Sequence, residues 1–188
     1  LARCASTFPT DGNTLNLDGG DTLQGSPLVY WLNRNPIEGA KVSARAMNLA
    51  GYDFVTIGNH DFNFGKETLE TYIHNLDARV ISANVEGVAG VERTAIVKLQ
   101  NGLRIGITGV VTHFVNLWEK PENLRGITVK EAFPAAAAAL DDLKEAGVDL
   151  TVCIYHGGFE SDLQTGELLS ATGENQGYGI CKELDFDI

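Results

Sequence analysis

An α/β fold built around parallel strands is predicted for this sequence, and three observations carry the prediction. Short apolar runs alternate along the chain with segments of helical spacing, which is the pattern of strands joined by helical crossovers. Many of the 21 glycines directly follow apolar runs, where tight turns from strand to helix need them. The 188 residues are 44% hydrophobic and 21% charged, a composition that suits one globular domain with a core.

The strands are predicted from apolar runs that are bounded by polar or glycine-rich segments. In chain order, the runs expected to form the main strands are Thr14–Leu17, Phe54–Ile57, Arg79–Ala83 and Leu150–Tyr155. Two further runs, Thr94–Leu99 and Leu103–Val111, flank Asn101-Gly102, which is a strong hairpin signal. We therefore expect an antiparallel pair to interrupt the otherwise parallel pattern.

The helices are predicted from apolar residues at helical spacing, in two cases with a glycine that ends the helix. In chain order, the expected helical segments are Val42–Ala50 before Gly51, Glu67–Leu76, Val129–Ala146 before Gly147, and Glu174–Leu184. Two glycines inside the last segment, Gly177 and Gly179, weaken its helical pattern. The alanine-rich stretch of the third segment indicates close helix packing.

Charge and composition exclude several classes of partner. The formal net charge is −11, so nucleic-acid polymers and anionic membrane surfaces are not expected to bind the domain as a whole. An acidic protein can still bind a small phosphate ester where metal cations reverse the field locally. No apolar run approaches the roughly 18 residues of a membrane span. The three cysteines, Cys4, Cys153 and Cys181, form no metal-binding pair and leave the disulfide state open.

Three polar clusters follow three of the predicted strands. The clusters are Gly20-Asp21, Gly58-Asn59-His60-Asp61 and His156-Gly157-Gly158. Ligands of open α/β sheets bind at the carboxyl ends of the strands, so the clusters are expected to converge on one crevice. The stretch from Asp21 to Asn59 is long enough for one helical crossover between neighbouring strands. His74, in a predicted helix, and His113, after a hairpin strand, are expected to be structural or solvated.

The side chains of these clusters predict a site for divalent transition metals. Asp21 offers a carboxylate able to bridge two cations, Asn59 a neutral carbonyl oxygen, and His156 an imidazole nitrogen. Mixed oxygen and nitrogen donors suit Mn, Zn, Fe or Co better than Ca or an all-thiolate zinc site. Two such cations about 3.5–4 Å apart clamp a phosphate, lower the pKa of a bridging water and stabilise an in-line displacement.

The motifs also match the pattern of a known family. The matching segments are Gly20-Asp21-x-x-Gln24-Gly25-Ser26-Pro27, Gly58-Asn59-His60-Asp61-Phe62-Asn63-Phe64-Gly65, and His156-Gly157. Together they resemble the calcineurin-like metallophosphoesterases, and within them the secreted nucleotidases. Further segments are similar to the 2′,3′-cyclic-nucleotide phosphodiesterase/3′-nucleotidase branch: Ser82-Ala83-Asn84-Val85, Gly109–Lys120 with Trp118, and Glu174-Asn175. The resemblance implies a layered β-sandwich flanked by helices.

The resemblance also implies a role for each residue of the clusters. Asp21 matches the ligand that bridges two metals, and Asn59 and His156 match ligands of the second metal. His60 matches the catalytic histidine, which binds no metal, stabilises the phosphoryl oxygens and protonates the leaving alkoxide. Asp61 is expected to support the ligands from behind.

Departures from the family pattern accompany these matches. Gln24 and Asn63 occupy the two positions at which many relatives place a carboxylate that orients the histidine, and either amide could accept the imidazole N–H. The family's Asp-x-His of the first strand and Gly-His-x-His of the last are both absent. Residues 1–188 are therefore expected to form an incomplete catalytic domain, truncated at both ends. The resemblance further implies a C-terminal nucleotide-binding domain in the whole protein and an extracytoplasmic location.

Two-metal hydrolysis of phosphate esters of nucleotides is the expected activity, with 2′,3′-cyclic nucleotides and 3′-nucleotides favoured as substrates. The alternatives are a 5′-nucleotidase or UDP-sugar hydrolase, and a non-catalytic binding module with the same fold. His156-Gly157-Gly158-Phe159 resembles the oxyanion-hole loop of lipases. That chemistry needs a Gly-x-Ser-x-Gly elbow, which the sequence lacks.

Overall fold

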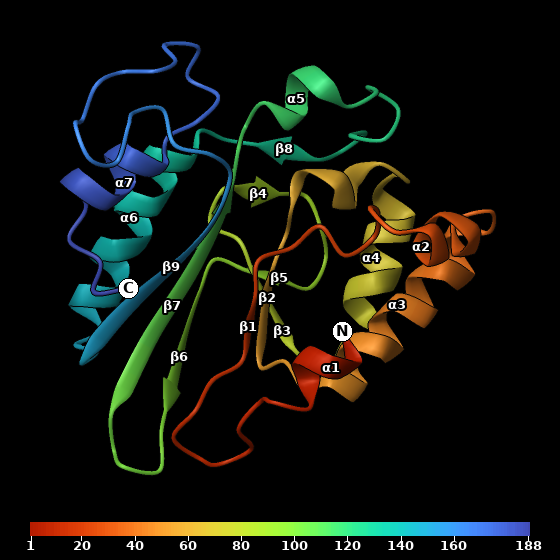
Figure 1. Ribbon diagram of the computed structural model, residues 1–188, viewed down its shortest axis with the longest axis horizontal. Coiled ribbons are helices and arrows are strands. Elements are labelled where there is room, and N and C mark those ends of the chain that lie inside the picture. Colours follow the sequence, from red (N-terminus) through yellow and green to blue (C-terminus); the bar gives the residue numbers. More distant parts are fainter.

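Two β-sheets stacked face to face form the centre of the structure, a computed structural model that describes residues 1–188 (Figure 1). The first sheet has the order β1-β2-β3-β5 with all strands parallel: β1 (Leu17–Asp18), β2 (Phe54–Thr56), β3 (Arg79–Ile81) and β5 (Val91–Glu92). The second sheet has the order β6-β7-β9: β6 (Thr94–Lys98), β7 (Arg104–Val111) and β9 (Leu150–His156). β6 pairs with β7 antiparallel, and β7 pairs with β9 parallel.

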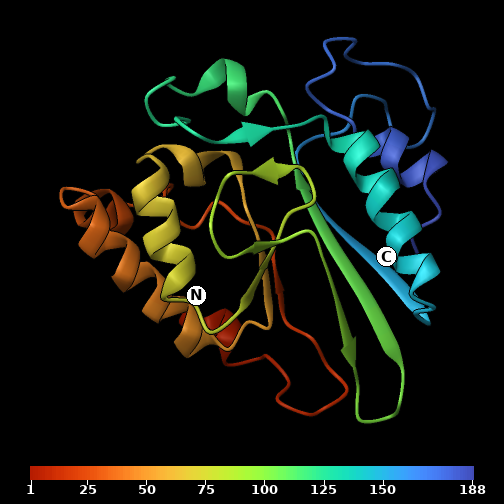
Figure 2. The ribbon, with the colours of Figure 1, turned by 180° about the vertical axis from the view of Figure 1, so that it is seen from behind.

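Helices cover the outer face of each sheet, which gives four layers (Figures 1 and 2). The helices beside the first sheet are α2 (Pro27–Leu32), α3 (Pro36–Ala50) and α4 (Lys66–His74). The helices beside the second sheet are α6 (Ala132–Glu145) and α7 (Gly177–Glu183). The remaining elements are α1 (Ala2–Ala5), the 3₁₀ helix η1 (Asn59–Phe62), α5 (Val115–Trp118), and the antiparallel pair β4 (Val85–Glu86) and β8 (Thr128–Val129). The predicted α/β class, with layered sheets and flanking helices, is confirmed.

Apolar side chains fill the spaces between the layers. Phe54 and Ile81 of the first sheet pack with Ile105, Ile107 and Val152 of the second. The two long helices, α3 and α6, each bury a stripe made mostly of small residues. The buried residues of α6 are Ala132, Ala136, Ala139, Leu140 and Leu143, at the spacing of one helix face. Because alanine keeps the helix axis close to the sheet, the alanine-rich sequence fits the close packing that it predicted.

Most predicted elements are present with slightly different ends. The hairpin around Asn101-Gly102 is confirmed, since Thr94–Lys98 pairs antiparallel with Arg104–Val111. The helix expected from Val129 begins only at Ala132, because Thr128 and Val129 pair with β4 instead. The last helix begins at Gly177 rather than at Glu174. No helix has both the length and the apolar character needed to cross a bilayer.

Parallel strands of both sheets end at the same edge of the sandwich, below α5 (Figure 1). β1 and β2 lie side by side in the first sheet, and β9 lies beside β7 in the second. The loops that follow β1 and β2 therefore meet the end of β9. The three polar clusters of the sequence lie at this edge.

Candidate active site

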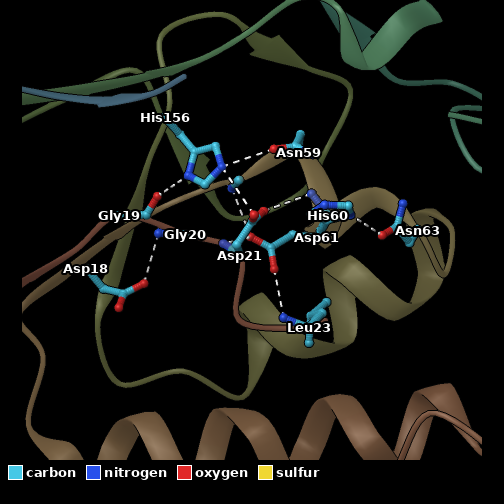
Figure 3. Close-up of polar contacts among 11 residues, drawn as sticks. Asp18, Gly19, Gly20, Asp21, Leu23, Asn59, His60, Asp61, Asn63 and His156 are labelled. Atoms are coloured by element: carbon cyan, nitrogen blue, oxygen red, sulfur yellow. Dashed lines mark hydrogen bonds and ion pairs between the residues drawn. The ribbon is translucent and has the colours of Figure 1, made fainter. Parts of the chain in front are cut away.

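Asp21, Asn59 and His156 come together at the sheet edge, as the sequence predicts (Figure 3). Asp21 lies in the glycine-rich turn after β1, Asn59 begins η1 after β2, and His156 is the last residue of β9. The Nε2 atom of His156 is 3.3 Å from Asp21 Oδ2 and 3.1 Å from Asn59 Oδ1. A polar cavity of about 560 Å³ opens beside them, and Trp118, Tyr155 and Glu174 also line it.

The hydrogen bond of the other ring nitrogen fixes what His156 presents to this cluster. Its Nδ1 atom is 2.6 Å from the carbonyl oxygen of Gly19, and a carbonyl can only accept, so Nδ1 donates. In the neutral ring Nε2 is then unprotonated and faces the oxygens of Asp21 and Asn59. A cation, either a proton on Nε2 or a metal ion, stabilises three acceptors that face one another.

The pKa values of this pair follow from its contacts. Burial works to raise the pKa of Asp21, but hydrogen bonds from His156 and from the backbone N–H of His60 outweigh it and lower the pKa. Burial works to lower the pKa of His156, yet its contacts with Asp21 and the Gly19 carbonyl raise the pKa above its ordinary value. Without a metal, the ring is therefore biased towards the imidazolium.

The donor set fits a divalent metal. A metal-binding histidine commonly donates its second N–H to a backbone carbonyl, as His156 does to Gly19. Asp21 adds a carboxylate and Asn59 a carbonyl oxygen on the far side of Nε2. No three side chains among His, Cys, Asp and Glu gather at any metal-binding position, so the cluster reaches three donors only through the Asn59 amide.

Asp61 ties together the two loops that carry these donors. Its side chain is 2% exposed, and its carboxylate accepts backbone N–H bonds from Asp21, Leu23 and Gly58, each at 2.9 Å. Burial raises the pKa of Asp61. The three N–H donors work to lower this pKa, and the nearby Asp21 charge works to raise it. Asp61 thus lies behind the cluster, at the place expected of a supporting residue.

Glycines let the loops after β1 and β2 touch. A Cβ on Gly20 would lie 2.3 Å from the backbone nitrogen of Gly58, and a Cβ on Gly58 would lie 2.2 Å from Asp21 Oδ1. Asp21 itself has φ 65° and is the one residue other than glycine with a positive φ. This left-handed conformation is uncommon for a residue with a side chain, and such strain is concentrated at functional sites.

His60 is exposed beside the cluster and is oriented by Asn63 (Figure 3). Its Nδ1 atom lies 2.9 Å from Asn63 Oδ1. Of the two amides that the sequence left as alternatives, Asn63 makes this contact. Gln24 is exposed and lines a different cavity together with Tyr30 and Arg34.

Two residues that no sequence motif indicates, Glu119 and Asn123, hold Asn63 in place. The carboxylate of Glu119, the residue after α5, accepts a hydrogen bond from the Asn63 amide nitrogen. Asn123 donates to Glu119 Oε1 at 2.9 Å and to the Asn63 carbonyl at 2.8 Å. Glu119 belongs to the stretch Gly109–Lys120 that carries part of the family resemblance, but no local pattern relates it to Asn63.

His74 and His113 lie where the sequence placed them. His74 is the last residue of α4, and His113 follows β7. Neither is among the residues that line the cavity at the cluster.

Curated relatives of this chain are nucleotide phosphoesterases. No protein-family model matches the sequence. The chain is 30% identical over 171 residues to the trifunctional nucleotide phosphoesterase protein YfkN of Bacillus subtilis. The match covers 81% of this chain and 12% of YfkN. It is 31% identical over 163 residues to a Treponema pallidum protein named as a 5′-nucleotidase, covering 84% of this chain and 26% of that protein. A 2′,3′-cyclic-nucleotide 2′-phosphodiesterase/3′-nucleotidase of Salmonella typhimurium is 27% identical, and the match covers 80% of this chain and 25% of that protein.

Solved structures show the same fold. A Staphylococcus aureus crystal structure, assigned by its name to the 5′-nucleotidases, superposes with a TM-score of 0.82 at 31% identity and covers 90% of this chain. The calcineurin-like phosphoesterase YfkN of Bacillus subtilis superposes with a TM-score of 0.77 at 26% identity and covers 99% of this chain. The chain spans 34% of the first of these chains and 60% of the second, so both are longer than the present sequence.

Proposed function

Since this chain is a homologue of the 5′-nucleotidase and 2′,3′-cyclic-nucleotide phosphodiesterase family, we propose that its protein hydrolyses phosphate esters of nucleotides with two divalent metals. The observation that carries the proposal is the convergence of Asp21, Asn59 and His156, with Nε2 of His156 facing two oxygens. Mn, Zn, Fe and Co suit this mixture of oxygen and nitrogen donors.

The residues divide the work as follows. Asp21, Asn59 and His156 would hold the metals, with Asp21 as the ligand that both metals would share. When bound, the metals supply charge stabilisation for the phosphoryl group and an activated water. His60 binds no metal, and because Nδ1 contacts Asn63, Nε2 is the atom that protonates the leaving alkoxide. Asp61 fixes the loops of Asp21 and Asn59.

Two substrate classes are carried by the relatives' names. The name of the phosphodiesterase/3′-nucleotidase relative supports 2′,3′-cyclic nucleotides and 3′-nucleotides as substrates, which the sequence motifs also favour. The relative named as a 5′-nucleotidase supports 5′-nucleotides as substrates equally well. A UDP-sugar hydrolase is the other form of this alternative. A non-catalytic binding module with the same fold is the remaining alternative, and it predicts that no ester is turned over.

The test uses the whole protein that contains this chain, supplied with Mn²⁺ and assayed on 2′,3′-cyclic AMP, 3′-AMP, 5′-AMP and UDP-glucose. We expect hydrolysis of at least one ester and its loss in Asp21→Asn, which removes one negative charge from a site that holds about four positive ones. His60→Gln should lower kcat by roughly 10²–10⁴ without changing the bound metal. An Asp21→Asn variant that keeps both metals and near-normal turnover would refute the mechanism.

Two wider features of the protein are also proposals. We place a nucleotide-binding domain C-terminal to the catalytic domain and the protein outside the cytoplasm, both on the basis of the family resemblance. Cell fractionation with an antibody against this chain tests the location. Recovery of the whole protein in the cytoplasmic fraction would contradict it.

A further inference from the structure

We infer that Glu119 is a positioning residue for His60 and that it acts through the side-chain amide of Asn63. The inference adds a residue to the machinery of the proposed function and rests on that function for its catalytic consequence. It starts from a three-member chain of hydrogen bonds, in which Glu119 contacts Asn63 and Asn63 contacts His60. Glu119 is 56 residues from Asn63 in the sequence and reaches it from the loop after α5.

The order of donors and acceptors in this chain follows from Glu119. Its carboxylate accepts from Asn63 Nδ2, from Asn123 Nδ2 at 2.9 Å and from the backbone N–H of Lys120 at 2.6 Å. An ionised carboxylate has no proton to donate, so the NH₂ end of the Asn63 amide must face it. The oxygen end of the same amide then faces His60.

The orientation of Asn63 in turn sets the tautomer of His60. Asn63 Oδ1 can only accept, so His60 Nδ1, 2.9 Å away, carries the hydrogen. With the Nδ1 hydrogen held by Asn63, the proton that the His60 imidazolium gives to the leaving alkoxide comes from Nε2, and the neutral ring that remains is unprotonated at Nε2. An amide alone would not impose this choice, because rotation of the amide by half a turn presents NH₂ to the ring instead. Glu119 removes that ambiguity. It is a carboxylate that acts on the His60 ring through Asn63 and not by direct contact.

The state of Glu119 supports this role. Burial works to raise the pKa of Glu119, but hydrogen bonds from Lys120, Asn63 and Asn123 outweigh it and lower the pKa. The carboxylate is therefore ionised at neutral pH and acts only as an acceptor. Glu119 also lines a cavity of about 360 Å³ together with His60, Asn63 and Trp118, so the contact lies at the edge of the site.

A purely structural role is the competing explanation, since Asn123 and Lys120 also bind Glu119 and fasten the loop that follows α5. Glu119→Gln separates the two roles. Its single amide oxygen can keep the bonds from Lys120 and Asn123, which share one carboxylate oxygen in the native protein. The new NH₂ group then faces Asn63, whose amide must turn and present NH₂ to His60.

The experiment measures catalysis and the His60 tautomer in the whole protein. We expect Glu119→Gln to lower kcat on bis-(p-nitrophenyl) phosphate about 10- to 100-fold, with KM, bound Mn²⁺ and melting temperature little changed. Adding Asn63→Asp should restore most of the loss, because a carboxylate at position 63 accepts from both His60 and the new amide. Glu122→Gln, an exposed residue of the same loop, is the matched control and should leave kcat unchanged.

The tautomer is read from long-range ¹H–¹⁵N spectra of ¹⁵N-histidine-labelled, metal-free protein at about pH 8.5, two units above the ordinary histidine pKa. The His60 signals are assigned from their absence in His60→Gln. We expect protonated Nδ1 in the native protein and a shift towards protonated Nε2 in Glu119→Gln. An unchanged tautomer in that variant, or a lower kcat that Asn63→Asp fails to restore, would overturn the inference. If the native protein has no turnover, the proposed function fails, while the tautomer comparison still decides whether Glu119 orients His60.

Discussion

Replacing Asp61 by asparagine should be the most destabilising conservative change at the site. Asp61 Oδ2 accepts the N–H groups of Asp21 and Gly58, and Oδ1 accepts that of Leu23. An asparagine of the same shape has one acceptor oxygen, so it keeps two of these bonds at most and turns an NH₂ group towards the remaining N–H. The position is 2% exposed, so water cannot compensate.

The size of the effect follows from the hydrogen bonds. A hydrogen bond to a charged group contributes about 1.5–3 kcal/mol, and a buried N–H left without a partner costs about 1–3 kcal/mol. Relief from burying a charge offsets part of this loss, so we expect a decrease of about 2–4 kcal/mol in the free energy of unfolding. For a domain of this size, that corresponds to a melting temperature lower by roughly 5–15 °C.

Thermal melts followed by circular dichroism, with urea denaturation as a second measure, test this expectation. Asp141→Asn is the matched control, because Asp141 is exposed on α6, and its effect should stay within about 0.5 kcal/mol. If Asp61→Asn and Asp141→Asn melt within about 2 °C of the native protein, the carboxylate does not hold the two loops together. The reasoning about the site's construction would then be wrong.

Three further changes have defined outcomes. Gly58→Ala places a Cβ 2.2 Å from the Asp21 carboxylate, so it should destabilise the protein by about 1–3 kcal/mol and weaken Mn²⁺ binding in a titration. Gly19→Ala is the control and should have neither effect, because no atom lies within 4 Å of its Cβ. Burial raises the pKa of the Cys153 thiol to about 12, so iodoacetamide at neutral pH should label the two exposed cysteines of this chain but reach Cys153 only in denaturant; equally fast labelling of all three in peptide mass spectra would contradict this. Hydrogen bonds from the backbone N–H and the hydroxyl of Thr151 in β9 lower the pKa of Asp187. Its contribution to stability is therefore present above its ordinary pKa and is lost as the pH falls through the lowered value. An acid titration of Asp187→Asn should lack this loss of stability, and an acid profile equal to that of the native protein would refute the expectation.

The sequence predicted the parts of the site that depend on local pattern. Asp21, Asn59 and His156 each follow an apolar run, and strand ends of parallel sheets share an edge, so their convergence could be expected before any coordinates. Asp61 was expected behind them from the family resemblance, whereas the convergence of the three donors needed only short-range signals. Short-range signals of this kind need only the strand and its turn.

Other features depend on contacts that no local pattern contains. Glu119 reaches Asn63 only because the chain folds back over η1, and the intervening residues give no sign of it. The choice between Gln24 and Asn63 was open for the same reason. β4, β5 and β8 are two residues long, too short to show an alternating pattern, so the helix at Ala132 was predicted to begin too early.

The polar cluster takes its side chains from two separate sheets, so its donor distances depend on the distance between the sheets. Asp21 and Asn59 extend from one sheet and His156 from the other, so the 3.3 Å between Nε2 and Oδ2 changes whenever the sheets slide or spread. Gly109 sets part of that separation, because a Cβ there would lie 2.5 Å from the Thr56 hydroxyl of the facing strand. Substitutions between the sheets, far from any donor atom, would therefore change the distances between the donor atoms before they unfold the protein. Any redesign of this core has to preserve a spacing as well as a volume.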